Sequence, residues 1–575
     1  METRRFALVA LLGVLLFFIY QAWEKDYGPG VVATTSPAAA ATTASAATAA
    51  VPPPQATPVA GGPTSSSGPA TPSAPGLETS PARAATAGGG VVRVKTDTLN
   101  VAIATQGAGL QRVVLNRYAY SKADQQQHLT LLTDQRLSNH QPFFIFQTGL
   151  AGLKRPLSGD TTPFKATQPV YQLAAGQNTL TVPLTYVDTA GHYTVRVSYR
   201  FERGSYLVHL KREITNSGST ALQVAPYARW VRNTVQAGVP QKFVHTYFGM
   251  GLYEQDGSDY KFKKHELKDF KKDPLTVHQS GGWLAMLQQY FVAAVIPPKD
   301  AKVTYTGRPA GNGRYYTQML GATAVVAPGA SRSFDTKLYI GPKLQGQLDN
   351  VAPGLALTED YGIFTPIAKP LFWVLSKLEQ LTGNWGWAIV LLTLAIRGAF
   401  FKLSEKQYRS MAKMRKFGPR IKELKERYAG DREQLNRAMM ELYKKEKFNP
   451  LSGCWPVLLQ FPVFIALYYV LIESVEMRQA PFILWLQDLS SPDPYYILPI
   501  LYGISMWFQQ RLSGQFATME PTQQKLMNIM PIGLAAFFSM FPSGLVLYYV
   551  VSNAFTIVQQ YVITRRLDRE GLGRR

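Results

Sequence analysis

The 575-residue chain carries 60 lysines and arginines against 37 aspartates and glutamates, which gives a formal charge of +23. One cysteine excludes a disulfide framework, and no Cys/His spacing resembles a zinc or iron–sulfur site, so we expect no metal and no cofactor. The charge does not indicate DNA binding, because no basic helix with base-reading residues and no RNA-binding signature is present; anionic phospholipids and the ribosome are better candidates as partners.

Residues 1–27 are predicted to form a transmembrane anchor. Arg4 and Arg5 precede an uncharged apolar run, and Trp23 follows it. This order favours an uncleaved helix with a cytoplasmic N-terminus over a cleaved signal peptide, because no small-x-small cleavage site follows directly. Residues 28–90 then consist almost entirely of Ala, Thr, Pro, Ser and Gly, a composition typical of a disordered linker.

Residues 91–358 are predicted to fold as one large antiparallel β-sandwich. Apolar and polar residues alternate in short runs, as they do from Tyr193 to Phe201, and turn-forming clusters separate these runs. A period of two indicates half-buried strands. The domain is basic, but long domains cross the membrane largely regardless of charge, so a location outside the cytoplasm is permitted. We expect the histidines of this domain to be scattered surface or core residues. The alternative is that the domain is a carbohydrate enzyme whose acid–base groups come from these histidines and one glutamate: His192, His209, His245, His265, His278 and Glu213.

Residues 359–383 are predicted to form an amphipathic helix along the membrane interface, because apolar residues recur there at helical spacing opposite charged ones. Five apolar stretches follow, one within 384–403 and four within 454–563, and each is predicted to span the membrane. These stretches are residues 385–401, 455–472, 496–508, 526–541 and 543–561. Most are shorter than the roughly 20 residues that a bilayer core demands, which implies a locally thinned bilayer.

Residues 404–453 are predicted to form a basic helical hairpin, in which Asp431 and Gln434 begin the second helix like a capping box. Basic residues outnumber acidic ones in this hairpin, whereas residues 472–494 are mainly acidic. The positive-inside rule therefore places the hairpin and the basic tail at 564–575 in the cytoplasm. The predicted fold class is multi-domain, with an N-terminal anchor, a polytopic α-helical membrane core of five spans, and a large antiparallel β-domain on the opposite side.

Arg397 lies inside the first of the five spans, where a charged side chain costs roughly 2.5 to 3.5 kcal/mol on insertion. None of the five spans contains Asp or Glu, so the usual buried partner is absent. One interpretation is that Arg397 extends to the cytoplasmic headgroups, since Lys402 is only about one helical turn further on.

A hydrated groove is the interpretation that we favour for Arg397, because other polar residues recur along the spans. Several lie at three- and four-residue steps along the last span, and single ones occur on three others. Ordinary hydrogen bonding between helices is the alternative explanation of this stripe. The candidate groove residues are Thr393, Arg397, Gln460, Ser505, Gln509, Tyr549, Ser552, Asn553, Thr556, Gln559 and Gln560.

Four segments of the membrane core resemble the YidC/Oxa/Alb family of insertases: NPLSGCWP at 449–456, RQAPF at 478–482, DPYYILP at 493–499 and FPSGLVLYY at 541–549. The resemblance covers about residues 361–571. The β-domain behind an anchor further resembles the Gram-negative bacterial branch, whose periplasmic β-supersandwich is similar to sugar mutarotases but is not an enzyme. The resemblance implies a non-enzymatic inner-membrane insertase and chaperone. Its implied partners are nascent membrane proteins, the Sec translocon and the ribosome.

The resemblance also assigns roles to individual residues. Arg397, within TLAIRG at 393–398, corresponds to the charged residue of the family's groove, and either Tyr548 or Tyr549 corresponds to its groove tyrosine. The basic hairpin corresponds to a mobile cytoplasmic lid. The main competing function is an anion channel or transporter that uses Arg397 as a selectivity charge, although the chain lacks the internal repeats and charged rings typical of such proteins.

Overall fold

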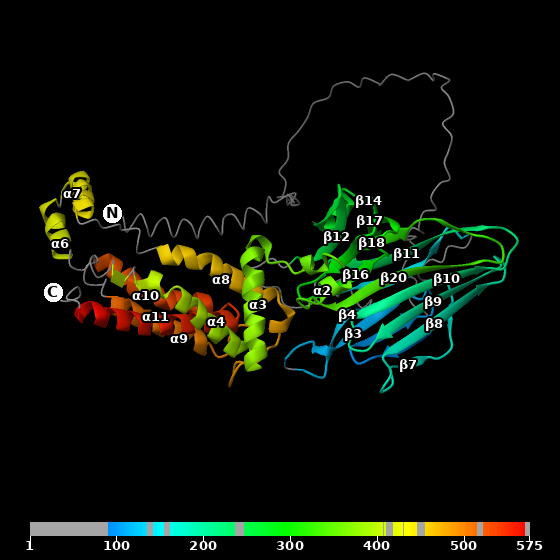
Figure 1. Cartoon of the computed structure of the whole chain (residues 1–575), viewed down its shortest axis with the longest axis horizontal. Helices are drawn as coiled ribbons and strands as arrows, with labels where there is room; N and C mark the ends of the chain where they lie inside the picture. Colours follow the sequence, from blue (N-terminus) through cyan, green and yellow to red (C-terminus); the bar gives the residue numbers. More distant parts are fainter. Residues whose placement is uncertain are drawn as a thin grey trace, which may run out of the picture.

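The computed structural model describes residues 90–122, 124–134, 142–153, 162–235, 247–405, 408–409, 418–428, 430–445, 455–513 and 521–569. A β-domain is followed by a bundle of helices, and α3 (Thr365–Thr382) lies crosswise between the two (Figure 1). The predicted anchor at 1–27 and all but the last residue of the predicted linker at 28–90 lie outside the described residues.

Two sheets form the β-domain in the described part of the chain. The first has eleven strands, nine of them in the order β14 (Leu275–Ser280), β17 (Lys302–Gly311), β18 (Arg314–Gly321), β11 (Leu222–Asn233), β5 (Phe144–Ala151), β3 (Leu110–Ala119), β2 (Leu99–Ala104), β1 (Val91–Lys95) and β7 (Val170–Gln172), with β19 (Ala324–Val326) on β11 and β4 (His128–Leu132) on β3. The second has nine strands, in the order β13 (Asp259–His265), β12 (Gly249–Asp256), β15 (Trp283–Leu287), β16 (Phe291–Ile296), β20 (Ser331–Pro342), β10 (Leu207–Asn216), β9 (Tyr193–Glu202), β8 (Thr179–Asp188) and β6 (Lys165–Ala166).

The predicted alternation is present in β9, where every second residue from Tyr193 to Phe201 is buried in the core between the sheets. The antiparallel prediction is confirmed for the paired strands with one exception, because β1 and β7 run parallel. Hairpins force antiparallel pairing, but a strand that returns to the sheet after a long connection can pair either way. β7 begins more than 70 residues after β1, at Val170, and is free of that constraint.

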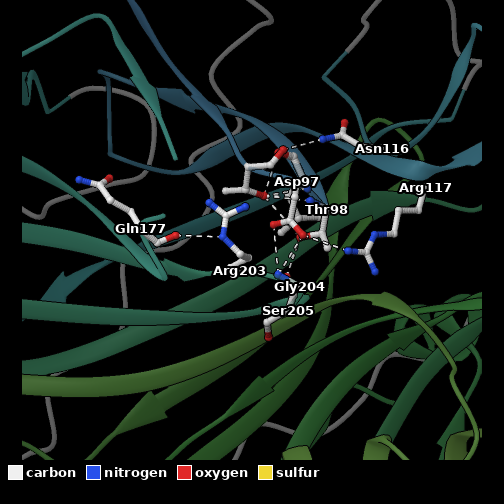
Figure 2. A network of polar contacts seen from close by, with 10 residues as sticks. Asp97, Thr98, Asn116, Arg117, Gln177, Arg203, Gly204 and Ser205 are labelled. Atoms are coloured by element: carbon white, nitrogen blue, oxygen red, sulfur yellow. Dashed lines mark hydrogen bonds and ion pairs between the residues drawn. The ribbon is translucent and has the colours of Figure 1, made fainter. Parts of the chain in front are cut away.

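A polar contact ties the two sheets together at one end of the sandwich. The carboxylate of Asp97, between β1 and β2, accepts a hydrogen bond from the backbone N–H of Gly204 at 3.0 Å and forms an ion pair with Arg117 at 3.0 Å (Figure 2). The hydroxyl of Thr98 donates to the carbonyl of Ser205 at 2.7 Å. Gly204 has a φ of 72°, a backbone conformation in which a residue with a side chain would be strained. These contacts fix the β9–β10 turn against the β1–β2 turn.

Five helices occupy the five predicted spans: α4 (Trp385–Ala399), α8 (Trp455–Glu473), α9 (Ile497–Ser513), α10 (Pro521–Phe538) and α11 (Ser543–Arg569). They run side by side in Figure 1. Among the described helices, Ser543–Arg566 alone has both the length and the hydropathy to cross a bilayer by itself, while the apolar helices Trp385–Ala399 and Gln460–Glu473 are shorter. The number of spans therefore stays a prediction. The helix α11 extends to Arg569, so the predicted tail begins as helix.

The helix α3 has the two faces expected of the amphipathic segment 359–383. Phe372 and Leu375 are buried, whereas Lys369, Lys377 and Gln380 are exposed. It begins later than predicted, because the short 3-10 helices η2 (Leu355–Thr358) and η3 (Gly362–Phe364) precede it and a proline occupies its first turn. Proline suits that position, where its missing N–H would have no partner inside the helix.

Asp488 and Asp493 organise the loop between η5 (Val475–Met477) and α9. Asp493 caps α9 by accepting the N–H of Leu498 at 2.7 Å, and it also accepts the indole N–H of Trp485 at 3.1 Å. Asp488 accepts the N–H of Gln479 at 3.1 Å. This loop contains two of the sequence segments that carry the family resemblance, so their acidic residues have a structural role.

The remaining helices are short. The basic hairpin contains α6 (Gly418–Arg427) and α7 (Arg432–Lys445), and Asp431 accepts the N–H of Gln434 at 3.0 Å, so the predicted cap is confirmed. The β-domain also includes η1 (Leu267–Lys271) and α2 (Leu348–Val351).

We predict that Asp97→Ala lowers the free energy of unfolding of the β-domain by about 0.5–1.5 kcal/mol, because it removes the acceptor of the exposed Gly204 N–H. Asp97→Asn is the matched control, since it keeps an acceptor oxygen and loses only the charge that faces exposed Arg117. Urea denaturation of the full chain, followed by circular dichroism, measures both variants. Equal losses for alanine and asparagine would mean that the ion pair, and not the backbone contact, carries the stability.

Candidate functional site

Arg397, near the end of α4, contacts α11. Its Nε donates a hydrogen bond to the Oγ of Ser552 at 2.6 Å, and Nη2 donates to the same oxygen. No carboxylate of the described residues pairs with this guanidinium. A guanidinium has five N–H donors, so one neutral hydroxyl satisfies only part of its capacity and none of its charge.

A small cavity of about 30 Å³ adjoins this contact. A water molecule needs roughly 10–15 Å³ of such volume, so the cavity has room for one or two. Gln460 of α8 donates a hydrogen bond from Nε2 to the hydroxyl of Tyr548 of α11 at 3.1 Å. The lining residues, contributed by the end of α4, the residues just after it, α8 and α11, are Ile396, Arg397, Phe400, Leu403, Ser404, Gln460, Val463 and Tyr548.

The polar stripe of α11 serves two neighbouring helices. Ser552 contacts Arg397, and Gln559 donates to the carbonyl of Phe401 at 3.3 Å. Residues seven positions apart lie close to the same side of a helix, so these two contacts define one polar side of α11. Asn553 points instead to α9, where its Nδ2 donates to the Oγ of Ser505 at 3.0 Å.

Two predicted residues bond to their own helices. The hydroxyl of Thr393 donates to the carbonyl of Ile389 at 2.6 Å, and that of Thr556 donates to the carbonyl of Ser552 at 2.8 Å. Such bonds satisfy a buried hydroxyl without a partner on another helix. Gln509 is half-buried on α9 and takes no part in the contacts above. We use the name polar seam for the residues that connect helices: Arg397, Gln460, Ser505, Tyr548, Ser552, Asn553 and Gln559.

The two adjacent tyrosines have different surroundings. Tyr548 is buried, lines the cavity and meets Gln460. The ring of Tyr549 packs among the rings of Phe464, Tyr502 and Phe538, with centroids 5.4, 5.7 and 4.9 Å away. The sequence left open which tyrosine faces the groove, and the geometry puts Tyr548 on the side of Arg397.

The α11 side of the polar seam is buried, whereas Arg397, Gln460 and Ser505 on the facing helices are half-buried. Ser552 is 0% exposed and Gln559 is 3% exposed. The side chains form separate hydrogen-bonded pairs beside a small cavity, and hydration of a wider groove stays a prediction. The sequence prediction did not include Ser404 in the site. Ser404 lies seven residues after Arg397, and residues seven positions apart lie close to the same side of a helix, so this spacing could have identified it.

The β-domain has a larger groove of about 620 Å³ on its surface. His278 lies in it, and its Nδ1 is 2.9 Å from the hydroxyl of Thr304. Glu213 lies on β10 of the other sheet and pairs with Lys211 at 3.8 Å, so these candidate acid–base groups are not brought together. His245 lies outside the described residues. Among the described residues, no group of three or more His, Cys, Asp or Glu is placed to hold a metal ion.

Comparison with known proteins accounts for both halves of the chain. The family model described as "60Kd inner membrane protein" matches residues 377–570, and the one described as "YidC periplasmic domain" matches residues 91–374. The "Membrane protein insertase YidC" of Nitrosococcus oceani is 41% identical, and the match covers 99% of this chain and 100% of that protein. The protein of the same name from Methylococcus capsulatus is 40% identical, and the match covers 99% of each.

A solved structure of an active YidC insertase is also similar, with 17% identity, a TM-score of 0.36, and coverage of 83% of this chain and 95% of that chain.

We predict that Tyr549→Ala lowers the free energy of unfolding by roughly 3 kcal/mol, because it removes an aromatic ring from a packed cluster. Tyr549→Phe keeps the ring and is expected to be nearly neutral. Tyr548→Phe should cost only about 1 kcal/mol, since it removes one hydrogen bond. Thermal unfolding of the purified full chain compares the three variants. A Tyr548→Phe loss as large as that of Tyr549→Ala would contradict the assignment of packing to Tyr549.

Proposed function

Because this chain belongs to the YidC family of membrane protein insertases, we propose that it inserts client proteins into the bacterial inner membrane by way of the polar seam. The family consists of inner-membrane proteins with a periplasmic domain, and its members are insertases, not enzymes. The observation that carries the proposal is Arg397, whose charge meets a single hydroxyl and a small cavity.

The proposed role of Arg397 is to attract polar and acidic groups of a client. A charge-assisted hydrogen bond to a carboxylate is roughly twice as strong as one to a neutral group, so a client's Asp or Glu can displace the hydroxyl of Ser552. Parting of α4 from α11 would open the seam to water as well as to the client. Water competes for the guanidinium, which keeps the bond transient and allows release into the lipid.

The seam would also shorten the apolar distance that a client's polar end must cross. Gln460 of α8, together with Ser552 and Gln559 of α11, offers amide and hydroxyl groups to a polar segment. Transfer of an unpaired polar group into an apolar medium costs several kcal/mol, and such partners reduce that cost. The helix α4 has 15 residues and would be only about 22 Å long, so a thinned bilayer would reduce the distance further.

The proposed topology is multi-pass, with five core spans and the anchor, both termini in the cytoplasm and the β-domain in the periplasm. The basic residues at the end of α11 and those of the hairpin support a cytoplasmic side. Ser404, on the cavity wall, lies where α4 leads toward that hairpin. The cavity would then open toward the compartment from which clients arrive.

The proposed partners follow from this topology. They are nascent membrane proteins as clients, the Sec translocon for clients that use both routes, the ribosome, and anionic phospholipids. The basic helices α6 and α7 support contact with an anionic surface, because lysines and arginines near a membrane bind anionic headgroups.

We predict that Arg397→Ala slows insertion of a client with an acidic translocated end by about tenfold to a hundredfold, the range that the loss of a charge-assisted hydrogen bond of roughly 1.5–3 kcal/mol implies. A matched client with asparagine or glutamine in place of the acids should be affected much less. Arg397→Lys should retain much of the activity, and Arg397→Glu should be the weakest. Insertion into liposomes that contain the purified protein measures the rates. Full activity of the alanine variant on both clients would refute the proposed role.

We predict that a cysteine at Ser404 reacts with a membrane-impermeant maleimide from the cytoplasmic side faster than a cysteine at Ser552, because Ser404 lies at the cavity wall and Ser552 is buried behind Arg397. A bound client should raise the reactivity of Ser552→Cys by opening the seam. Ser543→Cys, at the opposite end of α11, is the control and should stay unreactive from that side. All variants carry Cys454→Ser. Failure of both seam cysteines to react, with or without client, would exclude a hydrated groove.

A further inference from the structure

The β-domain and the helical bundle meet at a junction formed by the outer end of α8, the helix η5 and the segment 355–361. Val475 of η5 is part of the hydrophobic core of the β-domain. Gln289 of the β-domain donates a hydrogen bond to the carbonyl of Ile472 at 2.8 Å. Arg478 donates to the carbonyls of Ala119 and Tyr120 at 2.7 and 3.0 Å. The outer end of α8 is therefore held directly by the β-domain.

Two carboxyl groups from separate segments are enclosed in this junction. Glu359, between η2 and η3, is 8% exposed, and its Oε1 is buried without a hydrogen-bond partner. Glu476 of η5 accepts the N–H of Gln345 at 3.0 Å through Oε1, whereas its Oε2 is buried without a partner. An ionised carboxylate can only accept hydrogen bonds, so two buried oxygens without donors are costly. A protonated carboxyl group supplies the O–H donor that is missing.

Charged groups around the pair favour the protonated form on balance. Burial, and after it the nearby Glu476, raise the pKa of Glu359 to about 8 against the opposite effect of Lys343 and Lys369. Burial likewise raises the pKa of Glu476. The ionisable groups that face these two carboxyls and Lys343 from the packed segments are Tyr118, Lys264, Tyr339, Asp349, Asp360, Tyr361, Lys369 and Glu473.

Lys343 is the buried cation of this cluster. It lies directly after β20 and is 4% exposed, and its nearest opposite charges include Glu473, Asp360 and Glu359. Asp360 is already paired with Lys264. The charge of Lys343 is therefore shared among Glu473, Asp360 and Glu359, so Glu359 receives only part of it.

We propose that Glu359 and Glu476 form a proton-binding site at the domain junction, and that the bound proton holds the β-domain against the outer end of α8. When the proton leaves, hydration of the two carboxylates lowers their free energy. Because they reach water only when the junction opens, the β-domain then separates from the bundle. Glu476 of this site lies on η5, directly after the helix that carries Gln460 of the polar seam. Acidity on the outer side of the membrane would thus control how firmly that helix is held.

The direction of the pH dependence follows from linkage. The pKa of Glu359 is about 8 in the docked form, whereas an exposed glutamate has a pKa of about 4.3. Between these two pH values the docked form binds more protons than the separated form, so docking is strongest below about pH 4.3 and weakens as pH rises to about 8. For one proton released on separation, the docking constant falls by up to about tenfold per pH unit within this window and changes little above it.

The experiment measures the distance between spin labels on the two sides of the junction. Cysteines replace Tyr120 of the β-domain and Leu484 of the outer loop, which are 51% and 76% exposed, in full-length protein with Cys454→Ser. Electron paramagnetic resonance of the protein in lipid nanodiscs, between about pH 4.5 and about pH 9, should show one short distance at acid pH that gives way to longer ones as pH rises toward about 8. A single unchanged distance over the whole range would overturn the proposal.

Variants identify the titrating groups. Glu359→Gln/Glu476→Gln should keep the short distance at the highest pH, because amides supply donors and do not ionise. Lys343→Met should move the transition to higher pH, since this cation lowers the pKa of Glu359. Glu213→Gln, on the exposed side of β10, is the matched control and should leave the transition unchanged. A transition that persists in the double glutamine variant but vanishes in Lys343→Met would assign the proton to Lys343 and overturn the proposal. If the double variant does not fold, Glu359→Gln alone should flatten the transition, and an unaltered curve would count equally against the site.

Discussion

The central constraint on this molecule is a guanidinium within an apolar helix that has no acidic partner. Arg397 is held by the hydroxyl of Ser552, so α4 and α11 must lie side by side at that level. Gln460 and Tyr548 close the same site from α8 and α11. The polar side chains of α11 and the placement of three helices around the cavity are consequences of accommodating this one charge.

The polar side chains that lie beside the polar seam on α4 and α11 bear on how easily the seam opens. Thr393 and Thr556 bond to their own helices and would keep these bonds in an open seam. Gln560 is 2% exposed, and neither heteroatom of its side chain has a hydrogen-bond partner. An unsatisfied buried amide costs about 1–3 kcal/mol. Entry of water beside Gln560 would recover that free energy, so the closed arrangement contains a built-in bias toward hydration.

Local periodicity predicted much of the fold, because the signals that determine it are local. Alternation identified β9, apolar runs identified the five core helices, and Asp431 identified the start of α7. The parallel pairing of β1 with β7 was not predicted, since it depends on where a long connection returns. Tyr548 and Tyr549 are adjacent in sequence and equally aromatic, so only the packing of α8 and α9 against α11 distinguishes them. Glu359 was assigned to the start of an amphipathic helix, because its burial arises from β20 and η5, which are distant in sequence.

Charged or ionisable groups without a full set of partners lie near both ends of α8, a cation at one end and carboxyl groups at the other. Near Gln460 the guanidinium of Arg397 meets no carboxylate of the described residues, and beyond Glu473 one carboxyl oxygen each of Glu359 and Glu476 is buried without a donor. These places are about 20 Å apart along the helix, from its 1.5 Å rise per residue. In each place the missing partner would be mobile: a client carboxylate at one end and a proton at the other. A fixed ion pair at either end would stabilise the helix in one position. Mobile counter-charges instead leave α8 free to respond to what is bound at its two ends.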